Sequence, residues 1–168
     1  MSGSLEALGK AVDSLTTYLQ EKGWAINPQK AQEPGLLVKF LDVVWSGKTK
    51  VLPSEIIGKV QVLPVSTAPS QLQEFLGILR YWRYFIFHLM ELLRPLYLLT
   101  KKGQKWDRGR TEQEAFQQAK LAVKLVQALG IFDPTLSAEL DGHVAQDGFS
   151  WSLCQSQKST WTPLGFWS

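Results

Sequence analysis

The stretch LQEFLGILRYWRYFI, residues 72–86, constrains the fold of this chain most, because its two sides differ in kind. On a helical wheel at about 100° per residue, one broad side is apolar and consists of Leu72, Phe75, Leu76, Leu79, Trp82 and Ile86. The other side carries an amide, a glycine, a cation and two phenols, namely Gln73, Gly77, Arg80, Tyr81 and Tyr84. The pattern predicts a helix from Ser70 to about Phe87 that buries one side and presents the other to a different partner.

The polar side of this helix has two interpretations. A glycine inside a helix costs about 1 kcal/mol relative to alanine, which suggests that something approaches the backbone at Gly77. Arginine can neutralise a phosphate, glutamine can bond to a base edge or sugar, and tyrosine can pack on a ribose or base, so the approaching partner could be nucleic acid. The alternative is that another helix packs on Gly77 and that the tyrosines are half-buried core residues.

A helix and a hairpin are predicted before this stretch. Apolar residues recur at helical spacing at Leu5, Leu8, Val12, Leu15 and Leu19, and Gly23 follows as a stop. Residues 35–45 form one predicted strand, in which Asp42 is a carboxylate within an otherwise apolar row. A turn at Ser46-Gly47 returns the chain into a short second strand.

The remaining elements alternate between helix and strand. A short helix is predicted at residues 54–62, and another at 88–99, where Pro95 marks a bend. After a basic loop at 101–110, the capping-box spacing from Thr111 to Glu114 opens a helix that Gly130 closes. Three strands are then predicted at 138–145, 149–155 and 161–167, and the chain is expected to be truncated inside this last sheet. The fold class is therefore α+β.

Composition and charge narrow the class of protein. The chain is 45% hydrophobic with seven Trp, which excludes a disordered chain. Residues 61–110 hold eight Lys or Arg against three Asp or Glu, a modest indication of a polyanionic partner, although solvated surface cations explain it as well.

The single cysteine, Cys154, excludes an internal disulfide framework. Neither a signal peptide nor a membrane span is recognised, so an intracellular location is expected.

The sequence resembles a known family. Five successive segments are similar to the Pol polyprotein of gammaretroviruses and related endogenous retroviruses. They are LQEFLGILRYWRYFI, LLRPLYLLTKKGQKWD, AFQQAKLAV, ALGIFDPTLSAELD and TPLGFWS. Upstream, GWAINPQKAQ and VKFLDVVWSG resemble the end of the reverse transcriptase palm and its primer-grip hairpin. The resemblance implies three segments: residues 1–52 as the end of the palm, 53–102 as the helical thumb, and 103–168 as a partial connection domain with an RNase-H-like fold.

The resemblance also implies roles for individual residues. Gln73, Gly77 and Tyr81, with Arg80 beside them, match positions that track the minor groove of the template–primer duplex. Leu41, Asp42 and Val43 align with the primer grip, where glycine is usual at the position of Asp42. We expect diffuse phosphate contacts from Lys101, Lys102 and Lys105, for which solvated lysines are an equal alternative. The wheel adds Tyr84 to the nucleic-acid-binding set.

No catalytic residue is expected in this chain. The family's polymerase site holds two Mg²⁺ ions on carboxylates that include an Asp-Asp pair, and this sequence contains no such pair, so no cofactor and no metal site are expected here. A metal site at Glu139, Asp141 and Asp147 is disfavoured. His88 and His143 have no sequence partner at the spacing of a metal site or catalytic triad.

The expected function follows from these residues. The chain resembles a fragment of an RNA-directed DNA polymerase that binds an RNA–DNA or DNA duplex and that works with the missing palm, fingers and RNase H portions of Pol. The alternative is a non-catalytic endogenous-retrovirus remnant acting as a protein-interaction module, since the helix at 5–19 and the hairpin lack a visible packing partner. A translated relic without function is the third possibility.

Overall fold

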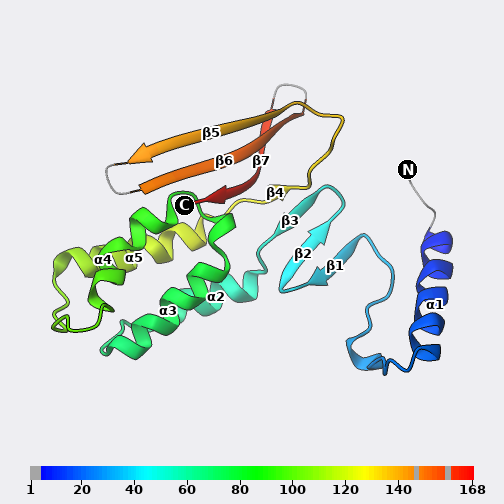
Figure 1. Ribbon diagram of the computed structural model, residues 1–168, viewed down its shortest axis with the longest axis horizontal. Coiled ribbons are helices and arrows are strands. Elements are labelled where there is room, and N and C mark those ends of the chain that lie inside the picture. Colours follow the sequence, from blue (N-terminus) through cyan, green and yellow to red (C-terminus); the bar gives the residue numbers. More distant parts are fainter. Residues whose placement is uncertain (1–4, 146–147, 158–159) are drawn as a thin grey trace.

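A computed structural model describes residues 5–145, 148–157 and 160–168 (Figure 1). Within this part the chain forms five α-helices and two antiparallel sheets, which confirms a mixed helix and sheet architecture. The helices are α1 Leu5–Glu21, α2 Ser54–Val62, α3 Pro69–Tyr81, α4 Leu89–Leu99 and α5 Arg110–Lys124. The strands are β1 Leu37–Phe40, β2 Val43–Ser46, β3 Thr49–Val51, β4 Leu129–Gly130, β5 Ala138–Ala145, β6 Gly148–Gln157 and β7 Thr160–Trp167.

The helices α2 to α5 share one hydrophobic core. All six residues on the predicted apolar side of residues 72–86 lie in this core and are at most 4% exposed, so that prediction is confirmed. Phe75 of α3 meets Phe116 of α5 with ring centroids 4.4 Å apart. Burying a side chain of this size contributes about 1.5–3 kcal/mol, so this side of α3 anchors the bundle and leaves the opposite side free for another role.

The helix of residues 72–86 ends earlier than predicted. Trp82 leaves helical geometry, and its N–H bonds back to the carbonyls of Leu79 and Arg80. A 3₁₀ turn, Arg83–Phe85, follows, and His88 adopts a left-handed φ of 50° just before α4. The prediction of a helix to Phe87 is therefore wrong. The apolar spacing continues past Trp82, but the chain must reverse there for α4 to reach the same core.

The predicted strand at 35–45 is two strands. Phe40 of β1 pairs with Val43 of β2, and the two residues between them, Leu41 and Asp42, have φ of 50° and 56°. Two consecutive positive φ angles are typical of a type I′ hairpin turn, and aspartate tolerates this region better than most residues. Asp42 therefore lies at an exposed hairpin tip and not, as predicted, within an apolar row.

The sheet that contains this hairpin includes a strand from far along the sequence. Its order is β1-β2-β3-β4, and β4 joins through the pairs Lys50–Leu129 and Thr49–Gly130. The prediction that Gly130 closes the preceding helix is wrong, because α5 ends at Lys124. A Cβ on Gly130 would lie 2.8 Å from Leu164 Cδ2, so any side chain at this position would force Leu164 to shift where β4 passes β7.

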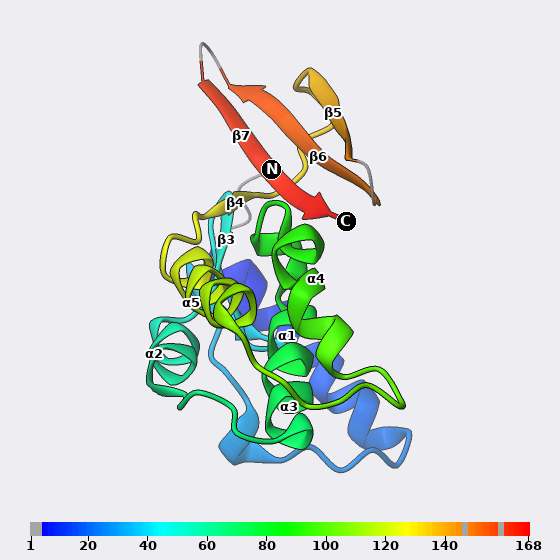
Figure 2. The ribbon, with the colours of Figure 1, turned by 90° about the vertical axis from the view of Figure 1, so that its left-hand side faces the viewer.

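The second sheet, in the order β5-β6-β7, confirms the three predicted C-terminal strands. It lies beyond one end of the helical bundle (Figure 2). Helix α5, which precedes it, begins one residue earlier than the predicted capping box. Glu112, and not Glu114, accepts the bond from the capping N–H, which belongs to Gly109 (2.9 Å).

Helix α1 stands apart from the rest of the molecule (Figure 1). It confirms the predicted N-terminal helix, and Gly23 follows it with a φ of 85°, a conformation that favours glycine. None of its residues is buried. Among the described helices, none combines the length and apolarity needed to cross a membrane.

Candidate nucleic-acid interface

The polar side of α3 is open. Gln73, Gly77, Arg80 and Tyr81 are all exposed, and a Cβ built on Gly77 would find no atom of a neighbouring element within 4 Å. The alternative in which another helix packs on Gly77 is therefore contradicted for the described part of the chain. A helix backbone that is bare at this point can accept a close approach by a ligand from outside.

The hairpin tip meets this side of α3. The hydroxyl of Tyr81 donates to the carbonyl oxygen of Leu41 over 3.4 Å, which joins residues 40 positions apart. Asp42, Gly77 and Tyr81 also line one hollow of about 730 Å³, which we call the hairpin–helix hollow. The structure thus brings together two of the predicted primer-grip residues and two of the predicted helix residues. Val43 lies beside the tip but is buried in the core.

The hairpin–helix hollow is lined mainly by apolar side chains and by a few charged ones. Its apolar lining comes from α2 and α3 and from the residue that follows each helix, namely Ile56, Val60, Val62, Leu63, Ile78 and Trp82. Asp42, Lys59 and Glu74 add charges of both signs. Lys59 and Glu74 were missed by sequence reasoning. Glu74 could have been found from its three-residue spacing to Gly77, whereas Lys59 sits on another helix and carries no local signal.

The charges at the hairpin tip are only weakly paired. Lys39 Nζ lies 3.9 Å from an oxygen of Asp42 and 3.8 Å from one of Glu55, and all three side chains are largely solvated. Exposed pairs of this kind contribute about 0–1 kcal/mol. These weak pairs leave the carboxylate of Asp42 largely uncompensated at the tip, which disfavours a close phosphate.

A second hollow, of about 460 Å³, also borders Gly77. It is lined by Gly77, Arg80, Tyr81, Arg83 and Tyr84. Two guanidinium groups and two phenol rings around a bare backbone can bind a phosphate and stack on a sugar or base. Arg83 was missed by sequence reasoning because the wheel assumed a continuous helix through this position.

Tyr84 differs from the other residues of the predicted set. It belongs to the 3₁₀ turn and not to α3, and its half-buried ring packs against Phe85 with centroids 4.7 Å apart. Burial, and secondarily Tyr81, raises the pKa of its phenol, so the hydroxyl stays neutral. Lys50 Nζ lies 5.4 Å from the ring centroid, and burial lowers the pKa of this lysine. Tyr84 thus joins the 3₁₀ turn to β3 through its contact with Lys50.

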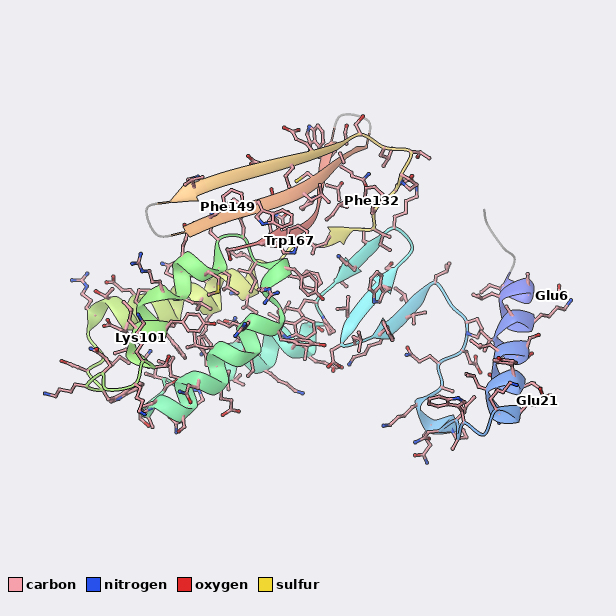
Figure 3. The ribbon with its side chains drawn as sticks, viewed as in Figure 1. Glu6, Glu21, Lys101, Phe132, Phe149 and Trp167 are labelled. Atoms are coloured by element: carbon pink, nitrogen blue, oxygen red, sulfur yellow. The ribbon has the colours of Figure 1, made fainter. Side chains whose placement is uncertain are left out.

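The three predicted lysines lie elsewhere. Lys101, Lys102 and Lys105 are exposed in the loop between α4 and α5. This loop lies at the end of the bundle away from the hairpin sheet, as the labelled Lys101 indicates (Figure 3). The structure does not bring them together with the hairpin tip, so a ligand touching both would have to extend along α3.

Two of the three candidate metal ligands lie in the described part of the chain, and they form no metal site there. Glu139 and Asp141 are exposed on β5, and Asp147 lies outside the described residues. Among the described residues, no group of three His, Cys, Asp or Glu side chains could hold a metal ion. Cys154 is a half-buried free thiol on β6.

His88 has distant partners that its sequence neighbourhood does not reveal. Its Nδ1 lies 2.8 Å from the Oγ of Ser150 and 3.2 Å from a carboxylate oxygen of Glu91, and its ring lies edge-on to His143 at 5.0 Å. A catalytic triad needs the nucleophile and the acid on opposite ring nitrogens. Here both contact the same nitrogen, and Ser150 is 1% exposed, so the cluster joins α4 to β6 and does not form a nucleophile.

Comparison with known proteins identifies the family. The Pol polyprotein of feline endogenous virus ECE1 is 31% identical over 128 residues, which is 76% of this chain and 12% of that polyprotein. The Gag-Pol polyprotein of avian reticuloendotheliosis virus is 32% identical over 124 residues, covering 72% of this chain and 11% of the relative. The chain is a homologue of part of retroviral Pol. The Gag-Pol polyprotein of baboon endogenous virus (strain M7) is 33% identical over 119 residues, or 71% of this chain and 7% of the relative. No protein-family model matches the chain.

This Pol homologue also shares its fold with solved structures. The foamy viral protease–reverse transcriptase in complex with an RNA/DNA hybrid superposes with a TM-score of 0.81 at 18% identity, over 99% of this chain and 23% of that one. The same viral protein in complex with dsDNA gives a TM-score of 0.78 at 18% identity, over 99% and 35% of the two chains. The chain thus spans only a small part of each relative, and its fold is that of a region of a retroviral protease–reverse transcriptase.

Proposed function

We propose that this chain is the duplex-holding part of a retroviral-type reverse transcriptase. Residues 1–52 would be the end of the palm with the primer-grip hairpin, residues 53–102 the thumb, and residues 103–168 a partial connection domain. The homology to Pol and the fold shared with a reverse transcriptase support this division. Helix α5, from the third segment, packs into the core of the second, so these two segments would move as one body.

The proposed ligand is an RNA–DNA or DNA duplex of template and primer. The observation that carries the proposal is the open backbone at Gly77 beside the contact between Tyr81 and the hairpin tip. Such a surface lets a minor groove approach α3 beside the hairpin tip. Solved relatives of the same fold hold an RNA/DNA hybrid or dsDNA, which supports the same ligand class here.

The side chains divide into two proposed roles. Gln73 and Tyr81 would touch sugars and base edges in the minor groove, where contacts are largely indifferent to sequence. Arg80 and Arg83 would contact phosphates next to them, and Lys101, Lys102 and Lys105 would bind the backbone further along the duplex. Neutralising about five phosphates gives a slope of about −4.5 for log K against log salt.

Catalysis is not proposed for this chain. Polymerisation would need Mg²⁺ held by carboxylates, and the described residues offer no such group. The chain would position a duplex for a catalytic centre supplied by other parts of Pol. We therefore expect duplex binding without incorporation of dNTPs.

Fluorescence anisotropy of a labelled RNA–DNA primer–template tests this proposal. The purified chain is titrated at several salt concentrations, alongside the variant Gln73→Ala/Tyr81→Ala. The matched control is Gln117→Ala/Gln118→Ala, which removes two exposed amides from α5 on a different face. We expect steep salt dependence, unchanged binding by the control, and about tenfold or greater weakening by the α3 variant.

Two results would contradict the proposal. One is an absence of binding at low salt by a chain whose circular dichroism shows that it is folded. The other is binding that the α3 variant and the α5 control weaken equally, because the ligand would then be held by general charge. Incorporation of dNTPs with magnesium would overturn the non-catalytic assignment.

A second candidate function is a protein-interaction module. It is favoured by apolar residues that the described chain leaves exposed. Those on and beside β1 are Leu36, Leu37, Phe40 and Leu41, and those on α1 include Leu5 and Leu15. Large exposed apolar patches on a folded protein commonly mark surfaces that bind another protein. Concentration-dependent sedimentation without any affinity for duplex would favour this candidate over the first.

A further inference from the structure

The outer edge of strand β1 is closed by a side chain. In the sheet order β1-β2-β3-β4, β1 is an edge strand, and no strand of the described chain pairs with its outer side (Figure 1). An edge strand normally leaves a row of backbone N–H and C=O groups unpaired. Here the side-chain amide of Gln32 bonds to both groups of Lys39. Its Oε1 accepts from the N–H over 2.9 Å, and its Nε2 donates to the carbonyl oxygen.

The register of the hairpin explains why Gln32 contacts Lys39. Phe40 and Val43 face each other and close the two-residue turn, and the pair behind them is Lys39 and Val44. Opposed residues alternate between hydrogen-bonded and non-hydrogen-bonded pairs, and the pair that closes a two-residue turn is hydrogen-bonded. The backbone groups of Lys39 therefore point away from β2. They are the last outward-facing groups of β1 before the tip, so a contact that fixes them also fixes the strand where it enters the turn.

Strand β1 is ordered by few other contacts. None of its four residues, all of which the structure describes, is buried, whereas Val43 at the start of β2 is 3% exposed. A segment with few buried contacts opens locally at a low cost in free energy. The ladder with β2 and the two bonds from Gln32 are therefore the main contacts that order the outer strand of the hairpin.

Gln32 extends from a capped turn. It follows the 3₁₀ turn Pro28–Lys30 by two positions, and the side chain of Asn27 caps this turn by accepting from the N–H of Gln29 over 2.9 Å. A capping asparagine and a proline at the first position both favour an ordered start to such a turn. The amide of Gln32 is thus presented to β1 from a braced backbone.

The opposite side of the hairpin tip is held by α3. The hydroxyl of Tyr81 donates to the carbonyl oxygen of Leu41, two positions beyond the residue that Gln32 holds. We propose that Gln32 is a positioning residue, which holds the tip at Leu41 and Asp42 in place beside a duplex bound on α3. The inference rests on the proposed function, because it assigns Gln32 a role in that same site. Gln32 acts through the backbone of Lys39 and does not itself touch the duplex.

The variant Gln32→Met tests the contact without nucleic acid, because it keeps the length of the side chain and removes both bonds. Amide hydrogen exchange at Lys39 should become about tenfold faster. The control Gln29→Met replaces another exposed glutamine of the same segment, keeps its backbone bond to Asn27, and should leave exchange at Lys39 unchanged. Because Gln32 and Lys39 are both exposed, urea unfolding should show the same core stability in both variants.

Anisotropy with the labelled primer–template tests the role in binding. Gln32→Met should bind about fivefold more weakly, the loss expected when about one net hydrogen bond of ordering is removed, and Gln29→Met should bind like the natural chain. The slope of log K against log salt should not change, because the variant removes no phosphate contact.

A double-mutant cycle shows whether Gln32 acts through the tip. Leu41→Gly removes the tip side chain, and glycine accepts its φ of 50°. Adding Gln32→Met to Leu41→Gly should cost no further affinity, because the tip has then lost its contact with the duplex. Adding it to Gln73→Ala should cost the full fivefold, because α3 and the tip contribute separately.

Four results would overturn the inference, and they separate it from the proposed function. Unchanged exchange at Lys39 in Gln32→Met would mean that Gln32 does not hold β1, whether or not duplex binds. Faster exchange with unchanged affinity, together with weakening by Gln73→Ala/Tyr81→Ala, would leave the proposed function standing and Gln32 without a role in it. An equal loss in the Leu41→Gly background would show that Gln32 does not act through the tip. Absence of duplex binding by the folded natural chain would refute the proposed function and this inference with it.

Discussion

Replacing Gly77 by alanine should make the fold more stable and the duplex interaction weaker. Gly77 lies in the interior of α3 with an ordinary helical φ, and a Cβ there would touch nothing within 4 Å. The substitution therefore gains helix propensity without steric cost, about 1 kcal/mol. For a chain of this size, that gain corresponds to a rise of about 2–4 °C in Tm.

The same methyl group would stand where we propose that the duplex meets the helix. If the minor groove contacts the backbone at Gly77, the added carbon must push it away or distort it. We expect affinity for the labelled primer–template to fall about tenfold, or ~1.4 kcal/mol. Stability and affinity would thus change in opposite directions, which a general disruption of the fold cannot produce.

Gly58 provides the matched control. It lies in the middle of α2, it is exposed, and a Cβ there would also touch nothing within 4 Å. Gly58→Ala should raise Tm by a similar amount and leave duplex affinity unchanged. Urea unfolding gives the stability of each variant, and anisotropy gives its affinity.

Two outcomes would refute this reasoning. If Gly77→Ala lowers the free energy of unfolding, the side of α3 at Gly77 is packed in solution and is not open. If it raises stability but binds duplex as well as the natural chain, nothing approaches the backbone at Gly77. The assignment of α3 as the minor-groove helix would then have to be abandoned.

Three further predictions concern the stability of the fold. Phe116→Ala empties the centre of the core, where Phe116 is fully buried, and should cost about 3–5 kcal/mol of unfolding free energy in urea; a loss below 1 kcal/mol would mean that the core is not packed as described. Gly130→Ala places a methyl 2.8 Å from Leu164 and should lower stability by about 1–3 kcal/mol, so an unchanged Tm would show that β4 does not pass β7 this closely. Hydrogen bonds from Thr135 hold the pKa of Asp133 below its ordinary 3.8, so the stability gained from ionisation is present above pH 3.8 and lost as the pH falls through the folded value. Asp133→Asn should flatten that decline in acid titrations followed by Trp fluorescence, and an unaltered slope would rule out this contribution.

The sequence by itself determined the parts of the fold that depend on local periodicity. The apolar side of residues 72–86, the N-terminal helix and the three C-terminal strands all follow from the spacing of apolar residues, and each is present as predicted. The sequence also predicted which side of the same helix is exposed, and this is correct as far as Tyr81, where α3 ends. Periodicity succeeds there because each residue's side is fixed by the geometry of its own element.

Only the tertiary structure decided where these elements end and which of them meet. The spacing of Trp82, Phe85 and Ile86 suits a helix, yet the chain turns at Trp82 because α4 must return to the same core. An apolar run likewise hid the turn at Leu41 and Asp42, which is defined by positive φ angles and not by residue type. Such endings depend on packing against distant segments, which overrides local preference.

The candidate site depends on such distant contacts most of all. Tyr81 reaches Leu41 across 40 positions, and β4 joins β3 from even further along the chain. No spacing within either segment encodes these contacts. The sequence supplied the exposed side chains of α3, and a shared core brought α3 and the hairpin tip to one surface, because Val43 beside the tip packs in the same core as the apolar side of α3.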